Sequence, residues 1–376
     1  MHSIKSMQVT LFAVLLRVMT DLASATTAPA PAPAYQPPLP LMWKVQDRDN
    51  AVYLLGSFHL LKDGDYPLSS DIDQAFLDAE RVVFEVSPAE LDDPTVAGRF
   101  LAAAAYDGPR TLSEVLTPRL REKLRRLRAR QGGSIEQVDG YEPWFVNLSL
   151  LMGLSQSLGF SAEQGLDRHL MARAAEAGKP IGGLETLEAQ LRVLDETPMD
   201  EQMVGVADFL DRVTGPAHRK VVSFHKDEVR EVSHGYGDGI DRPEDYLDAF
   251  ERFIRDSLDK VPALLVVTQR PRELTRQQLQ EVRAWLDAAT LESLTRLQML
   301  EKTPETYRTV NIERNDAWLP QLQAMLQAPG DDDVLVVVGA LHLLGDDGLV
   351  EKLRVQGYQV ERICSACTAV SEVADR

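Results

Sequence analysis

The chain has few cysteines, few aromatic residues and fewer basic than acidic side chains. Its 376 residues include two cysteines, Cys364 and Cys367, too few for a disulfide framework or for a zinc site made of thiols. The pair follows the last predicted strand, whereas a redox-active pair opens a helix, so we expect a local disulfide or inert thiols. Lysine and arginine number 40 against 58 acidic residues, giving a net charge of −18. Because a phosphate backbone requires a basic surface, we expect no nucleic-acid partner.

Several common site signatures are also missing. The sequence contains no phosphate-binding loop, no dinucleotide-binding glycine pattern and no Gly-x-Ser-x-Gly elbow. Hydrophobic residues make up 44% of the chain, which is enough for a full core. The length allows one large domain or two ordinary ones.

The N-terminus is typical of an exported protein. Lys5 gives a weakly positive start, Val9–Leu16 is a short apolar core, and Ala23-Ser24-Ala25 has the form cut by signal peptidase. We therefore predict a signal peptide at 1–25, with a membrane anchor as the alternative, and a Pro/Ala-rich linker at 26–41. The apolar run is too short to span a bilayer comfortably. These features predict a periplasmic or secreted bacterial protein with no stable membrane span after cleavage.

One short sequence motif occurs twice, near opposite ends of the chain. Leu54-Leu55-Gly56-Ser57-Phe58-His59-Leu60-Leu61 and Val337-Val338-Gly339-Ala340-Leu341-His342-Leu343-Leu344 share an apolar run, then glycine, two residues, histidine and two leucines. The pattern predicts a buried strand with a histidine at its carboxyl end, where open α/β sheets bind their ligands. Two matching histidines indicate one site built by two pseudo-repeats.

The sequence around each motif predicts a β-α-β unit. A hairpin at 42–55 leads into the first unit at 51–87, which has a helix over Ser69–Glu80 and a strand over Arg81–Val86. The second unit has the strand Val334–Val338, a helix within Gly345–Gln356 and a closing strand over Tyr358–Ile363.

The predicted fold is therefore α/β, with a central mixed sheet formed by the N- and C-terminal units. The sequence shows no clean domain boundary, so we predict a single domain at 42–363 with a helical insertion at about 112–330 and a tail at 364–376.

The middle of the chain contains further predicted elements. A helix over Gly165–Ala177 leads to a short strand at Lys179–Gly183, and Glu185 is predicted to open the helix Leu187–Leu194. A polar, glycine-rich stretch carries three more histidines, which we predict to be exposed loop residues rather than a second metal site: His218, His225 and His234.

Four side chains form the candidate metal site. His59 and His342 follow matching strands, Glu85 ends the strand beside the first of them, and Glu185 lies before a helix. Two imidazoles and two carboxylates suit a divalent ion such as Mn²⁺, Co²⁺ or Zn²⁺, with one glutamate free as general base. The alternatives are structural histidines, a solvated carboxylate for Glu85, and a favourable helix-dipole contact for Glu185.

Arg314 and Asn315 lie on a predicted helix at Glu305–Gln327, before the second histidine strand. One interpretation is a surface arginine paired with Glu313 or Asp316. The other is a catalytic arginine that neutralises an oxyanion or holds a substrate carboxylate.

Together these residues resemble the TraB/GumN family, which includes the eukaryotic Tiki proteins. The resemblance spans roughly 40–363 and rests on the two Gly-x-x-His motifs and on five further segments: Val83-Phe84-Glu85, Gly165-Leu166-Asp167, Lys179–Thr186 with Gln190, Glu313-Arg314-Asn315 and Gly357–Val360. It implies a fold like that of ChaN and the erythromycin esterases. It also implies metal-dependent hydrolysis carried by His59, Glu85, Glu185, Arg314, Asn315 and His342.

Two functions follow from this resemblance. The first is an exported metal-dependent hydrolase, most readily a peptidase, acting on a peptide or small molecule. The alternative is a non-catalytic protein that binds a peptide, a pheromone or haem, as some relatives are linked to these roles. Aromatic residues make up 6% of the chain and none cluster near either motif, which argues against haem. The sequence leaves the oligomeric state open.

Overall fold

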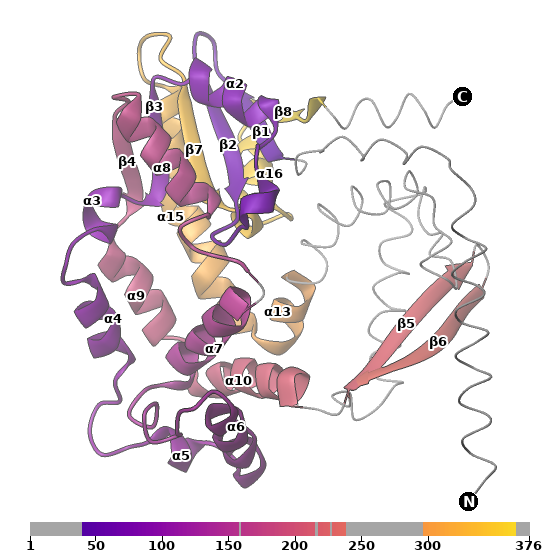
Figure 1. Cartoon of the computed structure of the whole chain (residues 1–376). Coiled ribbons are helices and arrows are strands. Elements are labelled where there is room, and N and C mark those ends of the chain that lie inside the picture. Colours follow the sequence, from indigo (N-terminus) through magenta and orange to yellow (C-terminus); the bar gives the residue numbers. More distant parts are fainter. Residues whose placement is uncertain (1–39, 158, 215–216, 226–227, 238–295, 366–376) are drawn as a thin grey trace, which may run out of the picture. The chain divides into compact units, whose positions relative to one another are not determined.

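The structure, a computed structural model, describes residues 40–157, 159–214, 217–225, 228–237 and 296–365 (Figure 1). The predicted signal peptide, most of the linker and most of the C-terminal tail lie outside these residues. Within the described part of the chain, no helix is long and apolar enough to cross a membrane. Cys364 is disulfide-bonded, whereas Cys367 lies outside the described residues.

A mixed six-stranded sheet forms the centre of the fold, in the order β4-β3-β7-β2-β1-β8. Its strands are β1 (Leu41–Gln46), β2 (Ala51–Ser57), β3 (Arg81–Val86), β4 (Ile181–Glu185), β7 (Val334–Gly339) and β8 (Gln359–Ile363). β1 pairs antiparallel with both neighbours, and the other neighbouring pairs are parallel. The N- and C-terminal units meet where β2 pairs with β7, in register from Val52↔Val334 to Ser57↔Gly339.

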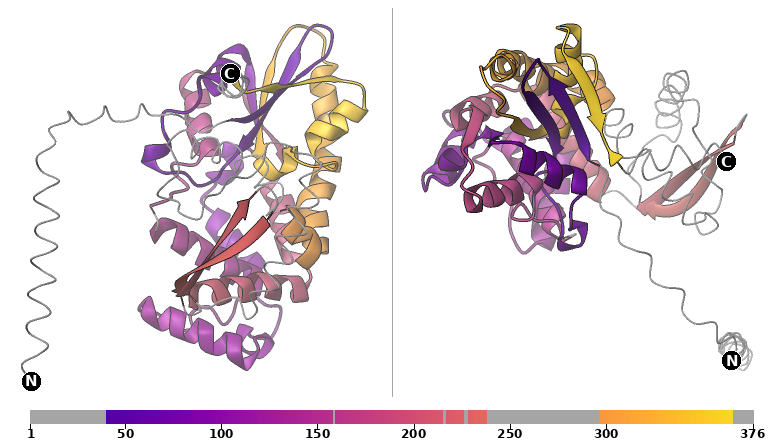
Figure 2. Two further views of the ribbon diagram at one scale, coloured as in Figure 1. Left: turned by 90° about the vertical axis from the view of Figure 1, so that its right-hand side faces the viewer. Right: turned by 90° about the horizontal axis from the view of Figure 1, so that it is seen from above.

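Helices cover both faces of this sheet (Figure 2). Alternate side chains of a strand point to opposite faces, so Tyr53 and Leu55 pack against α2 (Ser70–Asp78) and α8 (Leu166–Glu176). Val52 and Leu54 pack on the other face, against α15 (Arg314–Leu326) and α16 (Leu349–Val355). Burial on both faces explains the continuous apolar run of β7, because a central parallel strand has no solvated face.

A separate helical cluster lies in the middle of the sequence. It consists of α5 (Leu112–Val115), α6 (Pro118–Arg130), α7 (Pro143–Ser157) and α10 (Met199–Thr214). Leu124, Val146 and Leu210 are among its buried residues. This cluster agrees with the predicted helical insertion. Shorter elements nearby are α3 (Pro88–Leu91), α4 (Val96–Ala104) and α9 (Leu187–Asp195), which pack around Val86.

The middle segment also contributes strands: β4 corresponds to the strand predicted at Lys179–Gly183, whereas β5 and β6 were not predicted. β4 pairs with β3 and completes one edge of the central sheet. β5 (Ala217–His225) and β6 (Glu228–Gly237) form an antiparallel hairpin. His218, His225 and His234 lie on these two strands, so their prediction as loop residues was wrong. The neighbouring glycines and charges obscured short runs of β-favouring residues such as Val221-Val222.

Most other predicted elements are present. The hairpin is β1–β2, and the two predicted β-α-β units are β2-α2-β3 and β7-α16-β8. Within each unit, the two strands are separated in the sheet by other strands. The relation of the two units as pseudo-repeats stays a prediction. Glu185 ends β4 rather than opening a helix, because Thr186 caps α9 by accepting the N–H of Ala189 at 3.2 Å.

The helix predicted at Glu305–Gln327 consists of three consecutive segments. These are α14 (Pro304–Tyr307), a π-helical segment η3 (Arg308–Glu313) and α15. Remaining short elements are η1 (Asp63–Asp65), α13 (Leu297–Lys302) and η4 (Ala340–Leu343).

Candidate functional site

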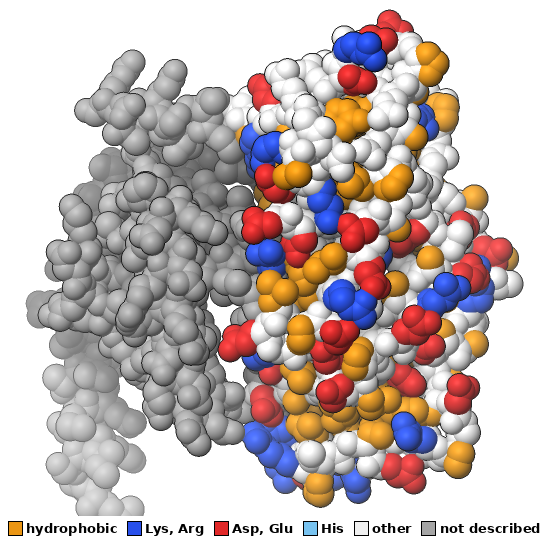
Figure 3. Space-filling view, turned by 180° about the vertical axis from the view of Figure 1, so that it is seen from behind, with side chains coloured by type: hydrophobic (Ala, Val, Ile, Leu, Met, Phe, Trp, Pro, Cys, Tyr) orange, Lys and Arg blue, Asp and Glu red, His pale blue; other side chains and the backbone are white. Residues whose placement is uncertain are grey.

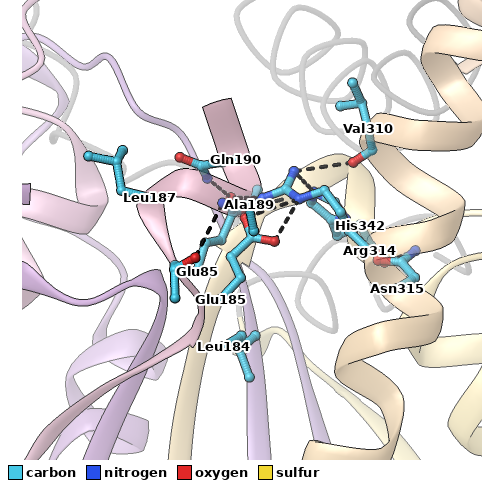
Figure 4. A network of polar contacts seen from close by, with 12 residues as sticks. Glu85, Leu184, Glu185, Leu187, Ala189, Gln190, Val310, Arg314, Asn315 and His342 are labelled. Atoms are coloured by element: carbon cyan, nitrogen blue, oxygen red, sulfur yellow. Dashed lines mark hydrogen bonds and ion pairs between the residues drawn. The ribbon is translucent and has the colours of Figure 1, made fainter. Parts of the chain in front are cut away.

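The predicted site residues meet at the carboxyl edge of the parallel strands. His59 follows β2, Glu85 lies in β3, Glu185 ends β4, and His342 lies in η4 directly after β7. Because these four strands are adjacent and parallel, their carboxyl ends share one edge of the sheet. Arg314 reaches the same place from α15 (Figure 4). The sequence therefore identified residues that the fold brings together.

Arg314 is buried, with 9% of its surface exposed, and it joins the two glutamates. Its Nη2 donates to Glu85 Oε2 and to Glu185 Oε1, each at 2.6 Å, and its Nε lies 3.1 and 3.2 Å from the two oxygens of Glu185. The interpretation of Arg314 as a surface residue was wrong. Its expected partner Glu313 pairs with Arg308, and Asp316 pairs with Lys352.

Every N–H of the Arg314 guanidinium has an acceptor within the protein. Besides the two glutamates, Nη1 donates to the Val310 carbonyl at 3.1 Å and lies 3.0 Å from His342 Nε2. A guanidinium has five N–H groups, and these contacts use all of them. In this arrangement Arg314 holds Glu85, Glu185 and His342 together and offers no N–H to a substrate oxyanion.

His342 is buried and held in one orientation. Its Nδ1 lies 2.8 Å from Asn315 Oδ1. Asn315 Nδ2 donates to the carbonyls of His342 at 3.3 Å and Asp347 at 2.9 Å, so the amide oxygen must face the ring. Nδ1 therefore carries the proton, and the lone pair lies on Nε2. Burial lowers the pKa of His342 to about 3, which keeps the ring neutral.

The two carboxyl groups differ although one guanidinium binds both. Burial raises the pKa of each. For Glu85 burial is outweighed by the charge of Arg314 acting together with the two histidines and the Gly339 N–H, so that its pKa falls to about 2. Glu85 also accepts from the Gly339 N–H at 2.6 Å and from Gln190 Nε2 at 3.0 Å. For Glu185, burial and the charge of Glu85 together outweigh Arg314, and its pKa is raised. Glu85 is therefore the fixed anion, and Glu185 is the group closer to taking up a proton.

His59 occupies a different environment from His342. Its side chain is 65% exposed, and its Nδ1 lies 2.8 Å from Asp167 Oδ2 in the first turn of α8. The hydrogen bond to Asp167 raises the pKa of His59 to about 9. Asp167 leaves Nε2 as the ring atom open to a ligand. This is the arrangement in which an outer carboxylate orients a histidine.

The space beside Gly339 is where the candidate ligands converge. A Cβ placed on Gly339 would lie 3.3 Å from Glu85 Oε1, 3.5 Å from His342 Cδ2 and 3.9 Å from His59 Nε2. The glycine thus leaves open a volume that three of the four predicted ligands border. Both oxygens of Glu185, the fourth predicted ligand, bind Arg314.

The donor chemistry of these three side chains fits a divalent ion, although they do not yet surround one point. Two imidazoles and a carboxylate are suitable ligands, and each imidazole has its Nδ1 bound to an oxygen acceptor. His342 Nε2 lies 3.9 Å from Glu85 Oε1, but it also accepts from Arg314. In the described ranges, no three His, Cys, Asp or Glu side chains already form a group that could hold a metal.

Sequence reasoning assigned no role to three neighbours of the site. Asp167 and Gln190 stood in the segments that resemble the TraB/GumN family, but neither was assigned a contact. Trp318, one turn after Arg314, lies with its ring 4.6 Å from the guanidinium carbon and 4.6 Å from the His342 ring. The spacing of Trp318 from Arg314 is a signal that could have suggested this contact.

Comparisons with known proteins agree with the sequence motifs. The model of the TraB/PrgY/gumN family matches residues 41–232 and 238–362. A part of the chain is similar to the type I restriction enzyme EcoKI endonuclease subunit of Escherichia coli K12, with 33% identity over 138 residues. This similarity covers 29% of the chain and only 12% of the length of that protein. No solved structure matches the chain.

Proposed function

The chain belongs to the TraB/PrgY/gumN family, and from this premise we propose that it is an exported hydrolase, most readily a peptidase, with its reaction centre at His59, Glu85 and His342. Export rests on the N-terminal sequence. The proposal includes a sheet built as in ChaN and the erythromycin esterases, with a peptide or small molecule as substrate.

The convergence of three side chains on the space beside Gly339 carries this proposal. Glu85 Oε1, the His342 ring and His59 Nε2 all border that space. Both histidines have Nδ1 bound to an oxygen acceptor, which leaves Nε2 to act on a ligand. Such a cluster at the carboxyl edge of a parallel sheet supports catalysis more directly than passive binding.

The proposed cofactor is a divalent ion of the Mn²⁺, Co²⁺ or Zn²⁺ type, held by His59, His342 and Glu85. When bound, such an ion supplies Lewis-acid polarisation and a nucleophile at neutral pH. His342 must exchange its contact with Arg314 to serve as a ligand, because one lone pair cannot serve both. His59, whose pKa is raised to about 9, must release its Nε2 proton when it binds the ion.

The remaining site residues support the reaction without contacting the ion. Arg314 neutralises the two buried glutamates and thereby keeps Glu85 ionised. Glu185, whose pKa is raised, is suited to take up or deliver a proton. Asp167 and Asn315 orient the two imidazoles.

A cleavage assay with matched variants tests the proposal. The protein would be incubated with a peptide library, with and without Mn²⁺, Co²⁺ or Zn²⁺, and the products identified by mass spectrometry. We expect cleavage by the wild type and its loss in His59→Asn, His342→Asn and Glu85→Gln. His169→Asn is the control, because His169 packs on Tyr66 and contacts none of the three.

Two results would count against the proposal. Cleavage that survives in all three site variants would place the reaction elsewhere. Saturable peptide binding by the wild type without any product would favour a binding protein.

A further inference from the structure

A second layer of polar side chains lies behind His342, on the side away from the reaction centre. Tyr307, Asn311 and Asn315 are spaced four residues apart along α14, the π-helical segment η3 and α15. Tyr307 and Asn315 are fully buried, and Asn311 is 1% exposed. Short π-helical segments are frequent at functional sites because they alter which side chains face one side of a helix.

Asp347 connects this layer to the loop that carries His342. Its backbone carbonyl accepts from Asn315 Nδ2 at 2.9 Å, and its Oδ1 accepts from the Tyr307 hydroxyl at 3.0 Å. Tyr307 in turn accepts from Asn311 Nδ2 at 3.1 Å. The loop from His342 to Asp347 is thus bound to the helix at both the backbone and the side chain.

Arg296 contacts both Tyr307 and Asp347 in this network. Its Nε lies 3.3 Å from Asp347 Oδ1 and 3.1 Å from the Tyr307 hydroxyl. The arginine packs directly on Gly345, where φ is +78° and a Cβ would lie 2.5 Å from Nε. A side chain at Gly345 would therefore strain the backbone and displace the arginine.

We propose that Tyr307 and Asp347 are positioning residues for His342. They fix the loop from His342 to Asp347 against α14 and α15, so that Asn315 can hold Nδ1–H while Nε2 faces the reaction centre. Without the Tyr307 hydroxyl, Asp347 loses one of its two side-chain donors and the Asn311 amide loses its acceptor. The loop then gains freedom, and Asn315 no longer has a fixed carbonyl at Asp347. The importance of this device for catalysis rests on the proposed hydrolase function, but ring orientation can be measured without a substrate.

Two tyrosine-to-phenylalanine variants give a matched test. Tyr307→Phe removes the hydroxyl behind His342. Tyr53→Phe is the control, because Tyr53 is also buried and its hydroxyl also bridges charged groups, Asp78 at 3.0 Å and Lys44 at 2.9 Å. Tyr53 lies near the start of β2, whereas His59 follows the end of that strand.

The readouts are the ¹⁵N NMR signals of the His342 ring, the affinity for Co²⁺ and the unfolding free energy. In Tyr307→Phe we expect the single Nδ1–H tautomer to become a mixture, and Co²⁺ affinity to fall roughly 10- to 100-fold, as on loss of an outer-shell partner. In Tyr53→Phe we expect a comparable loss of stability with the ring signals and Co²⁺ affinity unchanged. Asp347→Asn, which retains the backbone carbonyl, should reproduce part of the Tyr307→Phe effect.

The outcomes separate this proposal from the proposed function. If Tyr307→Phe and Tyr53→Phe leave identical His342 ring signals, positioning by Tyr307 is wrong even when the wild type cleaves peptides. If the ring signals change only in Tyr307→Phe while no variant cleaves a peptide, positioning is supported and the hydrolase proposal fails.

Discussion

The two Gly-x-x-His motifs have nearly the same sequence and opposite surroundings. His342 is 4% exposed, hydrogen-bonds to a neutral amide and has a pKa lowered to about 3. His59 has a side chain that is 65% exposed, pairs with a carboxylate and has a pKa raised to about 9. Between these two values one imidazole is neutral and the other is protonated.

This difference shows that the partner and the burial of a histidine, and not its local sequence, set its protonation. Burial penalises the charged ring at position 342, and its partner Asn315 carries no charge to compensate. At position 59 the negative charge of Asp167 stabilises the protonated ring. The repeated motif therefore yields one protonated imidazole, His59, and one neutral imidazole, His342.

Removing the cation beside the buried motif should have the largest effect on stability. Arg314→Met leaves Glu85 and Glu185 buried without a neutralising cation, and we expect the free energy of unfolding to fall by about 3–5 kcal/mol. Urea denaturation measures this loss. Arg126→Met is the control, because Arg126 pairs with Glu122 on the surface of α6 with 67% of its side chain exposed; its stability should match the wild type. Equal stability of the two variants would contradict the proposed role of Arg314.

Removing each histidine should separate stability from function. His342→Ala leaves Asn315 and Arg314 with buried groups that lack partners, at a cost of about 1–3 kcal/mol in unfolding free energy. His59→Ala should cost much less, because its side chain is largely exposed. Both should abolish cleavage. Calorimetry and the peptide assay measure the two effects, and equal thermal stability of the variants would show that the motifs differ less than their burial indicates.

The two histidines should also produce opposite pH dependences of stability. The folded-state pKa of His59 is raised from 6.5 to about 9, so its contribution is fully present below pH 6.5 and is lost as the pH rises through 9. The folded-state pKa of His342 is lowered from 6.5 to about 3, so its contribution is present above pH 6.5 and is lost as the pH falls towards 3.

Urea unfolding from pH 4 to 9 tests these two slopes by difference from variants. His59→Gln should remove only the loss of stability above pH 6.5, and His342→Gln should remove only the loss below it. A single variant that flattens both sides of the profile would show that the histidines titrate as one coupled unit.

The smallest effect on stability is expected when Asp167, the partner of the exposed His59, is replaced. Asp167→Asn removes the charge that raises the pKa of His59, so that pKa should fall towards its ordinary value of about 6.5. Stability should decrease by less than about 1 kcal/mol, because the His59 side chain is largely exposed to solvent. A pH titration of the ring protons by NMR measures the shift, and an unchanged pKa would mean that another group holds the proton.

Much of the sheet was predictable because its signals are local. The apolar run of Val334–Val338 predicts a buried strand, and the helix at Ser69–Glu80 follows from the spacing of Ile72, Ala75 and Phe76, all of which are buried. The strands β5 and β6 were not predicted, because glycines and charges interrupt their pattern. β4 was predicted as a strand, but its pairing with β3 depends on contacts between distant segments.

The sequence predicted which residues form the candidate site, but not the hydrogen bonds and ion pairs that join them. Repeated motifs identified His59 and His342, the positions of Glu85 and Glu185 in the chain suggested two carboxylate ligands, and the TraB/GumN resemblance supported a role for Arg314. No sequence pattern indicated that all five N–H groups of Arg314 would be used within the protein. Nor did any pattern assign Asp167 to His59, a pairing of residues 108 positions apart in the chain.

The sequence by itself determined the strands of the central sheet, the two histidine motifs and the family, since each depends on residues close together in the chain or on several motifs read in combination. Only the tertiary structure decided which histidine is buried, which glutamate stays ionised and which residues hold them. Burial and electrostatic pairing arise between distant segments. A displacement of a few ångströms between two such groups can reverse the direction in which a buried pKa is shifted. The same sequence motif can therefore carry an exposed, protonated histidine at position 59 and a buried, neutral histidine at position 342.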